Sequence, residues 1–256
     1  MPQYRAHPAY YDAEYASTKM LHQDVPFFLD HLPKKPQRIL EIATGTARAA
    51  IPLAQAGHRV TGIDIDARML KLARHKRDAV GLTERQLTLI KADALKFNLN
   101  QQFDWICIFF NTFLAFTTLD QQDRFLANVT RHLKPRGQFW LDIFHPDLAR
   151  LAKRKSRNVE PHLFHVPALD RTVFSWTDID QNPAQQTQRV TFHYKWFNEQ
   201  GVEQHEKNTF NLTYLFPREL QLLLDRHNLK LLKLYGNYDG SPLQPDSPRM
   251  IAWCTI

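Results

Sequence analysis

The sequence predicts an α/β protein with a doubly wound, mostly parallel sheet of seven strands and an antiparallel β-sheet inserted into it. Two patterns carry this prediction. From residue 37 onward, strand-like and helix-like segments alternate, as they do where helices join parallel strands. From residue 190 to 196, apolar and polar residues instead alternate one by one, which is typical of an antiparallel strand with one buried face.

The alternating segments give the elements of the parallel sheet in order. Its strands are expected at residues 38–42, 59–64, 87–91, 105–110 and 139–144. The fourth is an unbroken apolar run, as expected of a central strand that is buried on both faces. Helices are expected between the strands: Gly57 ends the first, Asp66 caps the second and Gly81 ends it, and the third precedes a turn at residues 135–137.

The pattern changes after residue 148. One face of the strand at residues 190–196 carries the apolar side chains of Val190, Phe192, Tyr194 and Trp196. A hairpin turn, a return strand and a further strand at residues 171–179 complete the inserted sheet. Pro217 then opens a helix, and two last strands return to the main sheet. The sequence thus predicts a core formed by residues 1–148 and 215–256 and an insert formed by residues 149–214.

Composition limits the classes of function. The 256 residues are 43% hydrophobic, which suffices for a large core, and two cysteines cannot make a disulfide framework. No secretory signal, membrane-spanning run or metal site is recognised, so we expect a cytoplasmic protein. The net charge of +7 raises the question of nucleic acid. However, the basic clusters at residues 68–77 and 150–157 are interpreted as solvated helix faces, so a nucleic-acid partner is possible but not favoured.

The most informative segment joins the first two strands. The first strand runs into a turn of small residues, Ala43, Gly45 and Ala47, and then into a helix. Small residues let a ligand approach the backbone, and a helix N-terminus offers N–H groups to an anionic group. Asp64 ends the next strand, 19 residues after Gly45, where a carboxylate can accept hydrogen bonds from both hydroxyls of a ribose.

This segment resembles the cofactor loop of class I S-adenosylmethionine-dependent methyltransferases, which have a Rossmann-like sheet. The family pattern is an acidic residue followed by three glycines at alternate positions, often with Thr before the third and Arg after it. This chain has Glu41, Ala43, Gly45, Thr46, Ala47 and Arg48 at these positions, so that only the middle glycine is kept. Later segments are also similar to the family, and the resemblance covers about residues 10–144 and 216–256.

The resemblance implies S-adenosylmethionine as cofactor and a set of binding residues. The set comprises Glu41, Ala43, Gly45, Thr46, Arg48, Asp64, Ile65, Met69, Asp93, Ala94 and Phe109. Asp93-Ala94 resembles the acidic motif that receives the adenine amino group. Structural alternatives stay open: a helix cap for Asp64, a turn former for Asp93 and an acceptor for loop amides for Glu41. Arg48 either pairs with the methionine carboxylate or lies on the surface. Met69 and Phe109 either contact the cofactor or belong to the core.

Candidates for catalysis and for the acceptor lie at the same edge of the sheet. Tyr11 and Tyr15 belong to a segment that resembles the helix closing over the cofactor in small-molecule members, where an aromatic face stabilises a cation. His145 follows the fifth strand and suits a general base, or it is an ordinary exposed loop residue. Tyr238 and Asp239 are candidate acceptor contacts, although turn chemistry explains Asp239 equally well. We expect the insert to form a substrate lid over an enclosed, aromatic pocket.

Three functions stay open for a monomer or homodimer without a membrane partner. The favoured one is methyl transfer to nitrogen or oxygen of a small molecule. The second is an RNA or protein methyltransferase, which the basic clusters suggest, and the third is a cofactor-binding protein without transfer activity, which Ala43 and Ala47 suggest. A dinucleotide oxidoreductase is the main rival from the loop alone, but Asp93 and the antiparallel insert fit it poorly.

Overall fold

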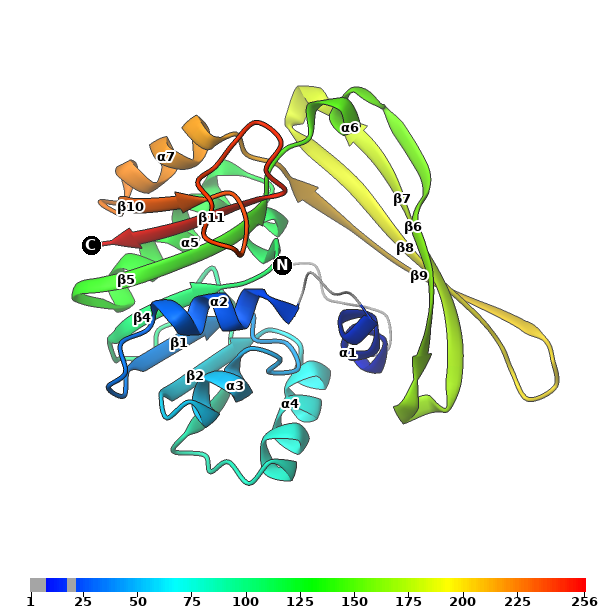
Figure 1. The fold of residues 1–256 in the computed structure, drawn as a ribbon, viewed down its shortest axis with the longest axis horizontal. Helices are drawn as coiled ribbons and strands as arrows, with labels where there is room; N and C mark the ends of the chain where they lie inside the picture. Colours follow the sequence, from blue (N-terminus) through cyan, green and yellow to red (C-terminus); the bar gives the residue numbers. More distant parts are fainter. Residues whose placement is uncertain (1–7, 18–21) are drawn as a thin grey trace.

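The computed structural model describes residues 8–17 and 22–256. Its main sheet has seven strands in the order β10-β11-β5-β4-β1-β2-β3, and of these described strands only β11 runs in the direction opposite to the other six (Figure 1). The strands are β1 Arg38–Ile42, β2 Arg59–Asp64, β3 Leu87–Lys91, β4 Phe103–Ile108, β5 Leu133–Phe144, β10 Lys230–Tyr235 and β11 Arg249–Thr255. The doubly wound, mostly parallel fold predicted from the sequence is confirmed.

Helices cover both faces of this sheet, and each face has its own buried cluster. One cluster packs beneath α2 (Asp24–His31), α3 (Ala50–Gln55) and α4 (Ala67–Ala79). The other packs beneath α5 (Leu119–His132) and α7 (Pro217–Arg226). Local sequence explains the ends of these helices: the Asp66 side chain accepts from the backbone of Arg68 at the start of α4, and Pro217 opens α7. No helix in the described ranges is long and apolar enough to cross a membrane.

Left-handed residues account for three of the element boundaries that differ from the sequence-based expectation. The helix that follows β1, α3, begins at Ala50 rather than near Ala47, because Ala47 has a left-handed φ of 62°. β4 ends at Ile108, two residues early, because Phe110 is also left-handed. β5 begins at Leu133 and contains the expected turn as an irregularity: it pairs with β4 at Leu133 and again from Gln138, while Arg136 between them has a φ of 63°.

The strand order places the ligand crevice. From β1 the chain continues to β2 and β3 on one side and returns to β4 on the other side, so that β1 and β4 are neighbours. In doubly wound sheets, ligands bind outside the carboxyl ends of the strands where this reversal occurs. The loops after β1 and β4 therefore border the crevice.

The insert is a separate antiparallel sheet with the order β6-β7-β8-β9. Its strands are β6 Lys155–Val166, β7 Arg171–Asn182, β8 Thr187–Phe197 and β9 Glu203–Thr213, and α6 (Leu148–Ala152) leads into it. β6 was not predicted, and its first three residues belong to the basic cluster that the sequence suggested was a solvated helix face. The basic side chains of this second cluster are exposed as expected, but the helical part of the interpretation is wrong, because the cluster runs from α6 into the start of β6.

The inner face of the inserted sheet packs against α1 (Pro8–Ser17), which lies between this sheet and the core (Figure 1). Tyr10 of α1 is 1% exposed, and its ring centroid lies 5.1 Å from that of Tyr194 and 6.0 Å from that of Trp196. The apolar face that the alternation predicted is therefore covered by a helix.

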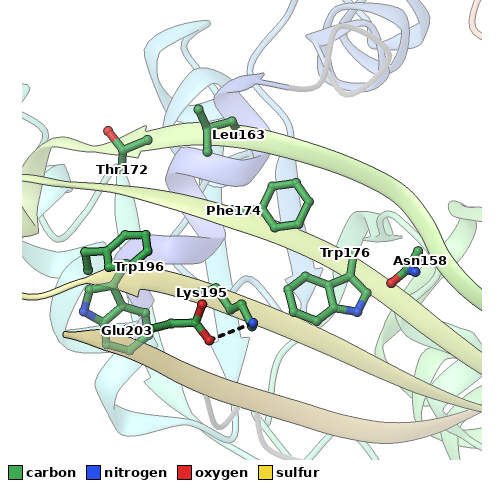
Figure 2. A pocket seen from close by; sticks show the side chains of 9 residues that line it. Asn158, Leu163, Thr172, Phe174, Trp176, Lys195, Trp196 and Glu203 are labelled. Carbon is green, nitrogen blue, oxygen red and sulfur yellow. Dashed lines mark ion pairs between the residues drawn. The ribbon is translucent and has the colours of Figure 1, made fainter. Parts of the chain in front are cut away.

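A hollow of about 520 Å³ lies on the opposite, outer face of the same sheet (Figure 2). Phe174 and Trp176 line it, together with Lys195, whose ammonium pairs with Glu203 at 2.7 Å. This aromatic hollow is not the enclosed pocket expected beneath the lid, because it is on the face turned away from α1. On the inner face, Ala9 and Tyr10 of α1 pack against the sheet.

Candidate active site

The turn after β1 has a backbone that favours glycine at every second position. Ala43, Gly45 and Ala47 have φ values of 58°, 55° and 62°. Residues other than glycine rarely adopt this left-handed conformation, because their Cβ atom crowds the following carbonyl oxygen. The chain thus keeps the backbone of a three-glycine loop while placing alanine at two of the three positions.

Asp64 at the end of β2 faces this turn. Its carboxylate accepts the Gly45 N–H at 2.9 Å and the Asp66 N–H at 2.8 Å. Burial raises the pKa of Asp64, and these two backbone bonds oppose that effect. The helix cap is instead the neighbouring Asp66, so the contacts do not support the alternative in which Asp64 only caps α4.

Glu41, the acidic residue of the loop pattern, is buried beneath the turn. Its carboxylate accepts the Thr44 hydroxyl at 2.6 Å. Burial raises the pKa of Glu41 to about 7, and the Thr44 bond and the nearby Arg48 charge act in the opposite direction. These contacts are those of a carboxylate that stabilises the loop from below.

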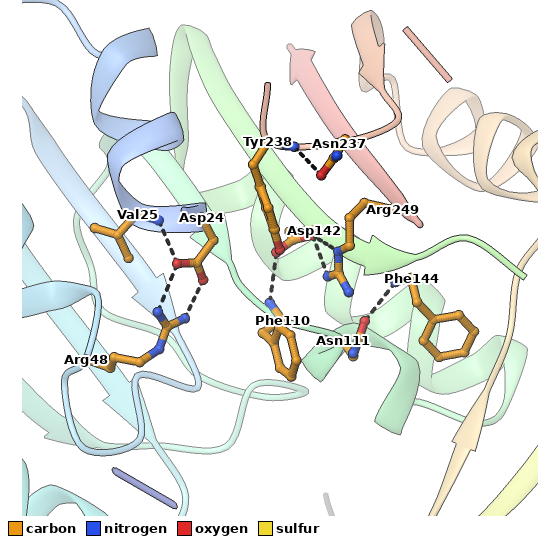
Figure 3. A network of polar contacts seen from close by, with 10 residues as sticks. All are labelled: Asp24, Val25, Arg48, Phe110, Asn111, Asp142, Phe144, Asn237, Tyr238 and Arg249. Atoms are coloured by element: carbon orange, nitrogen blue, oxygen red, sulfur yellow. Dashed lines mark hydrogen bonds and ion pairs between the residues drawn. The ribbon is translucent and has the colours of Figure 1, made fainter. Parts of the chain in front are cut away.

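Arg48 is mostly buried rather than on the open surface, and its role toward the methionine carboxylate stays a prediction. It forms a two-point ion pair with Asp24 at the start of α2, in which the terminal guanidinium nitrogens Nη1 and Nη2 each donate to one carboxylate oxygen (Figure 3). Asp24 is 1% exposed. The Arg48 guanidinium carbon also lies 5.0 Å from the ring centroid of Tyr15.

Other predicted cofactor residues have contacts within the fold. The Asp93 carboxylate accepts the Leu95 N–H at 2.9 Å, as a turn former does. Met69 and Ala94 are buried, and the Met69 methyl would lie 3.4 Å from a Cβ placed at Gly45. Phe109 is buried against Phe28, and Ile65 is half-buried after β2. A cofactor role for these residues stays a prediction.

Helix α1 is bound to the cofactor turn by polar contacts. Thr46 is fully buried, and its hydroxyl donates to the Asp12 carboxylate at 2.6 Å. Lys76 of α4 donates to the same carboxylate at 3.0 Å. The rings of Tyr11 and Tyr15 lie 4.2 Å apart, and Tyr15 meets Phe110 edge-on at 5.2 Å. The tyrosine-bearing helix thus lies over the carboxyl ends of β1 and β4.

His145 is half-buried directly after β5. Its Nδ1 lies 3.0 Å from the carbonyl oxygen of Ser247. Because a carbonyl only accepts, Nδ1 must donate, and the neutral ring then carries its lone pair on Nε2. This is the tautomer that a general base acting through Nε2 requires.

Tyr238 and Asp239 differ in their surroundings. Tyr238 is buried, and its hydroxyl donates to the Asp142 carboxylate at 2.9 Å (Figure 3). Asp239 is exposed and accepts from the backbone and the hydroxyl of Ser241 in its own turn. The contacts of Asp239 are those of the turn chemistry alternative.

Sequence reasoning missed four residues that the structure brings to this crevice: Asp24, Phe110, Asp142 and Arg249. Asp142 and Arg249 form an ion pair in which both side chains are almost completely buried. A signal for Asp142 existed, because a carboxylate within the apolar run of β5 needs a buried partner. Asp24 and Phe110 carried no comparable signal.

Comparison with known proteins finds a methyltransferase domain and the same fold. Residues 39–137, which span β1 through the start of β5, match the model of a methyltransferase domain. The cypemycin N-terminal methyltransferase of a Streptomyces species is 25% identical over 227 residues, which are 89% of this chain and 86% of that protein. The chain therefore contains a methyltransferase domain and resembles the S-adenosylmethionine-dependent methyltransferases.

Solved structures of methyltransferases share the whole fold, insert included. An amino pentose methyltransferase from Micromonospora echinaspora, solved with S-adenosylmethionine bound, has a TM-score of 0.73 at 17% identity, covering 100% of this chain and 98% of that one. A sugar N-methyltransferase from Streptoalloteichus has a TM-score of 0.73 at 18% identity, covering 98% and 94%.

The residues after β1 and β2 fit S-adenosylmethionine in their chemistry. The Gly45 N–H donates to the Asp64 carboxylate, so the left-handed small-residue turn and the carboxylate that would face the ribose are adjacent. When bound, S-adenosylmethionine supplies a methyl group on a positively charged sulfur.

Proposed function

We propose that this methyltransferase acts on the amine nitrogen of a small molecule. The observation that carries the proposal is the aromatic cluster of Tyr11, Tyr15 and Phe110, which joins α1 to the carboxyl end of β4. Side chains from two distant segments thus close over the edge of the sheet where the acceptor must lie. A covered, aromatic site of this kind suits a small ligand better than a polymer.

The positions of the basic residues argue against an RNA substrate. Lys153, Lys155 and Arg157 line a hollow of about 480 Å³ at the junction of α6 and β6. None of its lining residues is a candidate cofactor or catalytic residue, and Arg157 is already paired with Asp180 at 2.6 Å. RNA recognition would need such side chains at the mouth of the crevice, since phosphate contacts dominate that affinity.

Nitrogen is favoured over oxygen by the named activities of similar proteins. The cypemycin enzyme is an N-terminal methyltransferase, and the Streptoalloteichus protein is a sugar N-methyltransferase. A peptide N-terminus and an amino sugar share a compact aliphatic amine. We therefore propose this group as the acceptor.

Methyl transfer to an amine asks two things of the chain. It must align the nitrogen in line with the methyl and sulfur, and such positioning contributes roughly 7–11 kcal/mol. It must also accept a proton, because only an unprotonated amine is a nucleophile. We propose that Nε2 of His145 accepts this proton, that Tyr11 and Tyr15 line the site, and that residues 149–214 act as its lid.

The test is transfer from methyl-labelled S-adenosylmethionine to two amines, glucosamine and an alanyl peptide, with glucose as the matched hydroxyl compound. Mass spectrometry should find a methylated amine and no methylated glucose. Tyr15→Phe, which keeps the ring, should retain activity, whereas Tyr15→Leu should lose most of it. Cofactor binding with no transfer, or salt-dependent RNA binding with RNA methylation, would contradict the proposal.

A further inference from the structure

Two consecutive residues after β4 have strained backbone conformations. Phe110 and Asn111 have φ values of 45° and 62°. Asparagine tolerates the left-handed region, but a bulky residue such as phenylalanine does so at a cost of roughly 1–2 kcal/mol. Strain of this kind persists only where the surrounding structure enforces it, and it is concentrated at functional sites.

The end of β5 enforces this turn through three hydrogen bonds. The Asp142 carboxylate accepts the Phe110 N–H at 3.4 Å, and the Asp142 carbonyl oxygen accepts the Asn111 N–H at 3.0 Å. In return, the Asn111 side-chain oxygen accepts the Phe144 N–H at 2.7 Å (Figure 3). Asp142 thus binds the turn through both its backbone and its side chain.

The Asp142 carboxylate is itself held from two further segments. The Nε–H of Arg249, at the start of β11, donates a hydrogen bond to the carboxylate at 3.0 Å, and the Tyr238 hydroxyl donates another at 2.9 Å. Asp142 and Arg249 are 1% and 2% exposed. Burial raises the pKa of Asp142, and the Arg249 charge opposes this. A buried pair of this type is costly to break from one side, which keeps the carboxylate in place.

The turn places the Phe110 ring in the crevice. The ring lies edge-on to Tyr15 at 5.2 Å, and the Arg249 guanidinium carbon lies 5.2 Å from its centroid. Phe110 therefore connects the buried ion pair to the helix that covers the site.

We propose that Asp142 is a positioning residue for methyl transfer. Held by Arg249 and Tyr238, it fixes the left-handed turn at Phe110 and Asn111, and through Phe110 it sets the wall along which the acceptor amine approaches. This inference rests on the proposed function for its catalytic consequence. Its structural part, the control of the turn by the carboxylate, can be measured without an acceptor.

A matched pair of variants tests it. Tyr238→Phe removes one hydrogen bond to Asp142 and keeps the ring. Tyr235→Phe is the control, because its hydroxyl lies 3.0 Å from His31 Nε2, outside the network, in the same stretch of chain. The lost hydrogen bond is worth about 1 kcal/mol, which corresponds to a roughly fivefold change in an equilibrium. Hydrogen exchange in the segment 109–116 should therefore be roughly fivefold faster in Tyr238→Phe and unchanged in Tyr235→Phe. This measurement uses the protein with S-adenosylhomocysteine bound.

The kinetic readout uses glucosamine as acceptor. Tyr238→Phe should lower kcat by roughly fivefold, with KM for S-adenosylmethionine unchanged, because alignment is lost rather than cofactor binding. If Tyr238→Phe matches Tyr235→Phe in exchange, the carboxylate does not control the turn and the inference fails. Faster exchange with unchanged kcat would overturn the positioning role and leave only a structural one.

A second pair acts on the turn itself. Asn111→Ala removes the acceptor for the Phe144 N–H, whereas Asn111→Asp keeps an oxygen there and tolerates the left-handed backbone. Asn111→Ala should lower kcat, and Asn111→Asp should restore most of it. Asn228→Ala is the control for backbone strain alone, since Asn228 is exposed, has a φ of 56° and lies after α7. Equal losses in Asn111→Ala and Asn111→Asp would contradict the inference.

Discussion

The two alanines of the cofactor turn differ in what surrounds their methyl groups. Ala43 is half-buried, whereas Ala47 is fully buried in the cluster beneath α2 and α3. Both have a left-handed φ, and the Cβ atom makes this backbone conformation unfavourable by roughly 1–2 kcal/mol at each residue. Glycine at position 43 would therefore only relieve backbone strain, whereas glycine at position 47 would also leave a cavity in the packed core.

We predict that Ala43→Gly stabilises the protein and that Ala47→Gly leaves its stability nearly unchanged. At Ala43 the relief of strain exceeds the entropy cost of glycine, roughly 0.5–1 kcal/mol, which should raise Tm by about 2 °C. At Ala47 the loss of a buried methyl, about 1 kcal/mol, offsets the gain. Ala49→Gly is the control, because Ala49 is buried with a φ of −92° and should only lose stability. A lower Tm for Ala43→Gly would contradict this account.

Glu41 predicts a pH dependence of stability. Its folded-state pKa of about 7 lies above the ordinary value of 4.5, so the folded chain binds the proton more tightly than the unfolded chain. The stabilisation is fully present below pH 4.5 and is lost as the pH rises through 7. From pH 5 to 8, the free energy of unfolding of the wild type should fall by up to about 3 kcal/mol relative to Glu41→Gln. Urea unfolding measures this, with the exposed Glu84→Gln as control; parallel curves for wild type and Glu41→Gln would refute it.

At the candidate site, the sequence predicted loop residues better than their partners. Gly45 and Asp64 are adjacent in the structure as their strand-end positions indicated. The partner of Arg48 could not be predicted, because Asp24 belongs to a different element and the pairing depends on how α2 packs. The same holds for Arg249, which lies 107 residues from Asp142.

At the scale of elements, α1 connects the two sheets. Tyr10 packs on Tyr194 of β8, while Asp12 binds Thr46 in the cofactor turn. Glu14 reaches the inserted sheet as well, since Ser175 and Tyr194 donate to its carboxylate at 3.3 and 3.1 Å. The position of the helix over the crevice therefore depends on the lid as well as on the core.

We predict that Tyr10→Ala loosens α1 without unfolding the core. Truncating this buried ring costs roughly 3–5 kcal/mol locally, because it empties the contact between helix and sheet. Hydrogen exchange in residues 8–17 should become much faster, and affinity for S-adenosylhomocysteine should fall. Leu222→Ala, at an exposed position of α7, should change neither. Unchanged exchange in α1 would show that the helix is held by its polar contacts alone.

The elements with a clear period were predicted well, and those with a mixed signal were not. β1, β2 and β3 have the predicted bounds, because each is a short segment rich in branched apolar residues between polar or turn-forming stretches. β6 is half polar on both faces, so alternation could not find it. The early end of β4, before Phe110, and the irregularity at Arg136 in β5 depend on left-handed residues that are not glycine, which propensity does not predict.

At the scale of the molecule, four segments far apart in the sequence form the crevice: α1, the turns after β1 and β4, and the start of β11. Two buried ion pairs flank it, Asp24 with Arg48 and Asp142 with Arg249 (Figure 3). In both pairs the arginine charge is neutralised by its own carboxylate partner, so Arg48 and Arg249 do not present a net positive charge that would select an anionic polymer.

The most direct test of this account is a crystal structure with S-adenosylhomocysteine and glucosamine bound. We predict that the ribose lies on Asp64, that the sulfur lies beneath Tyr11 and Tyr15, and that the amine nitrogen faces the sulfur beside the Phe110 ring. The lid and α1 should cover both ligands. A crevice open to solvent, with Lys153 and Arg157 converging on the sulfur, would contradict the small-molecule function.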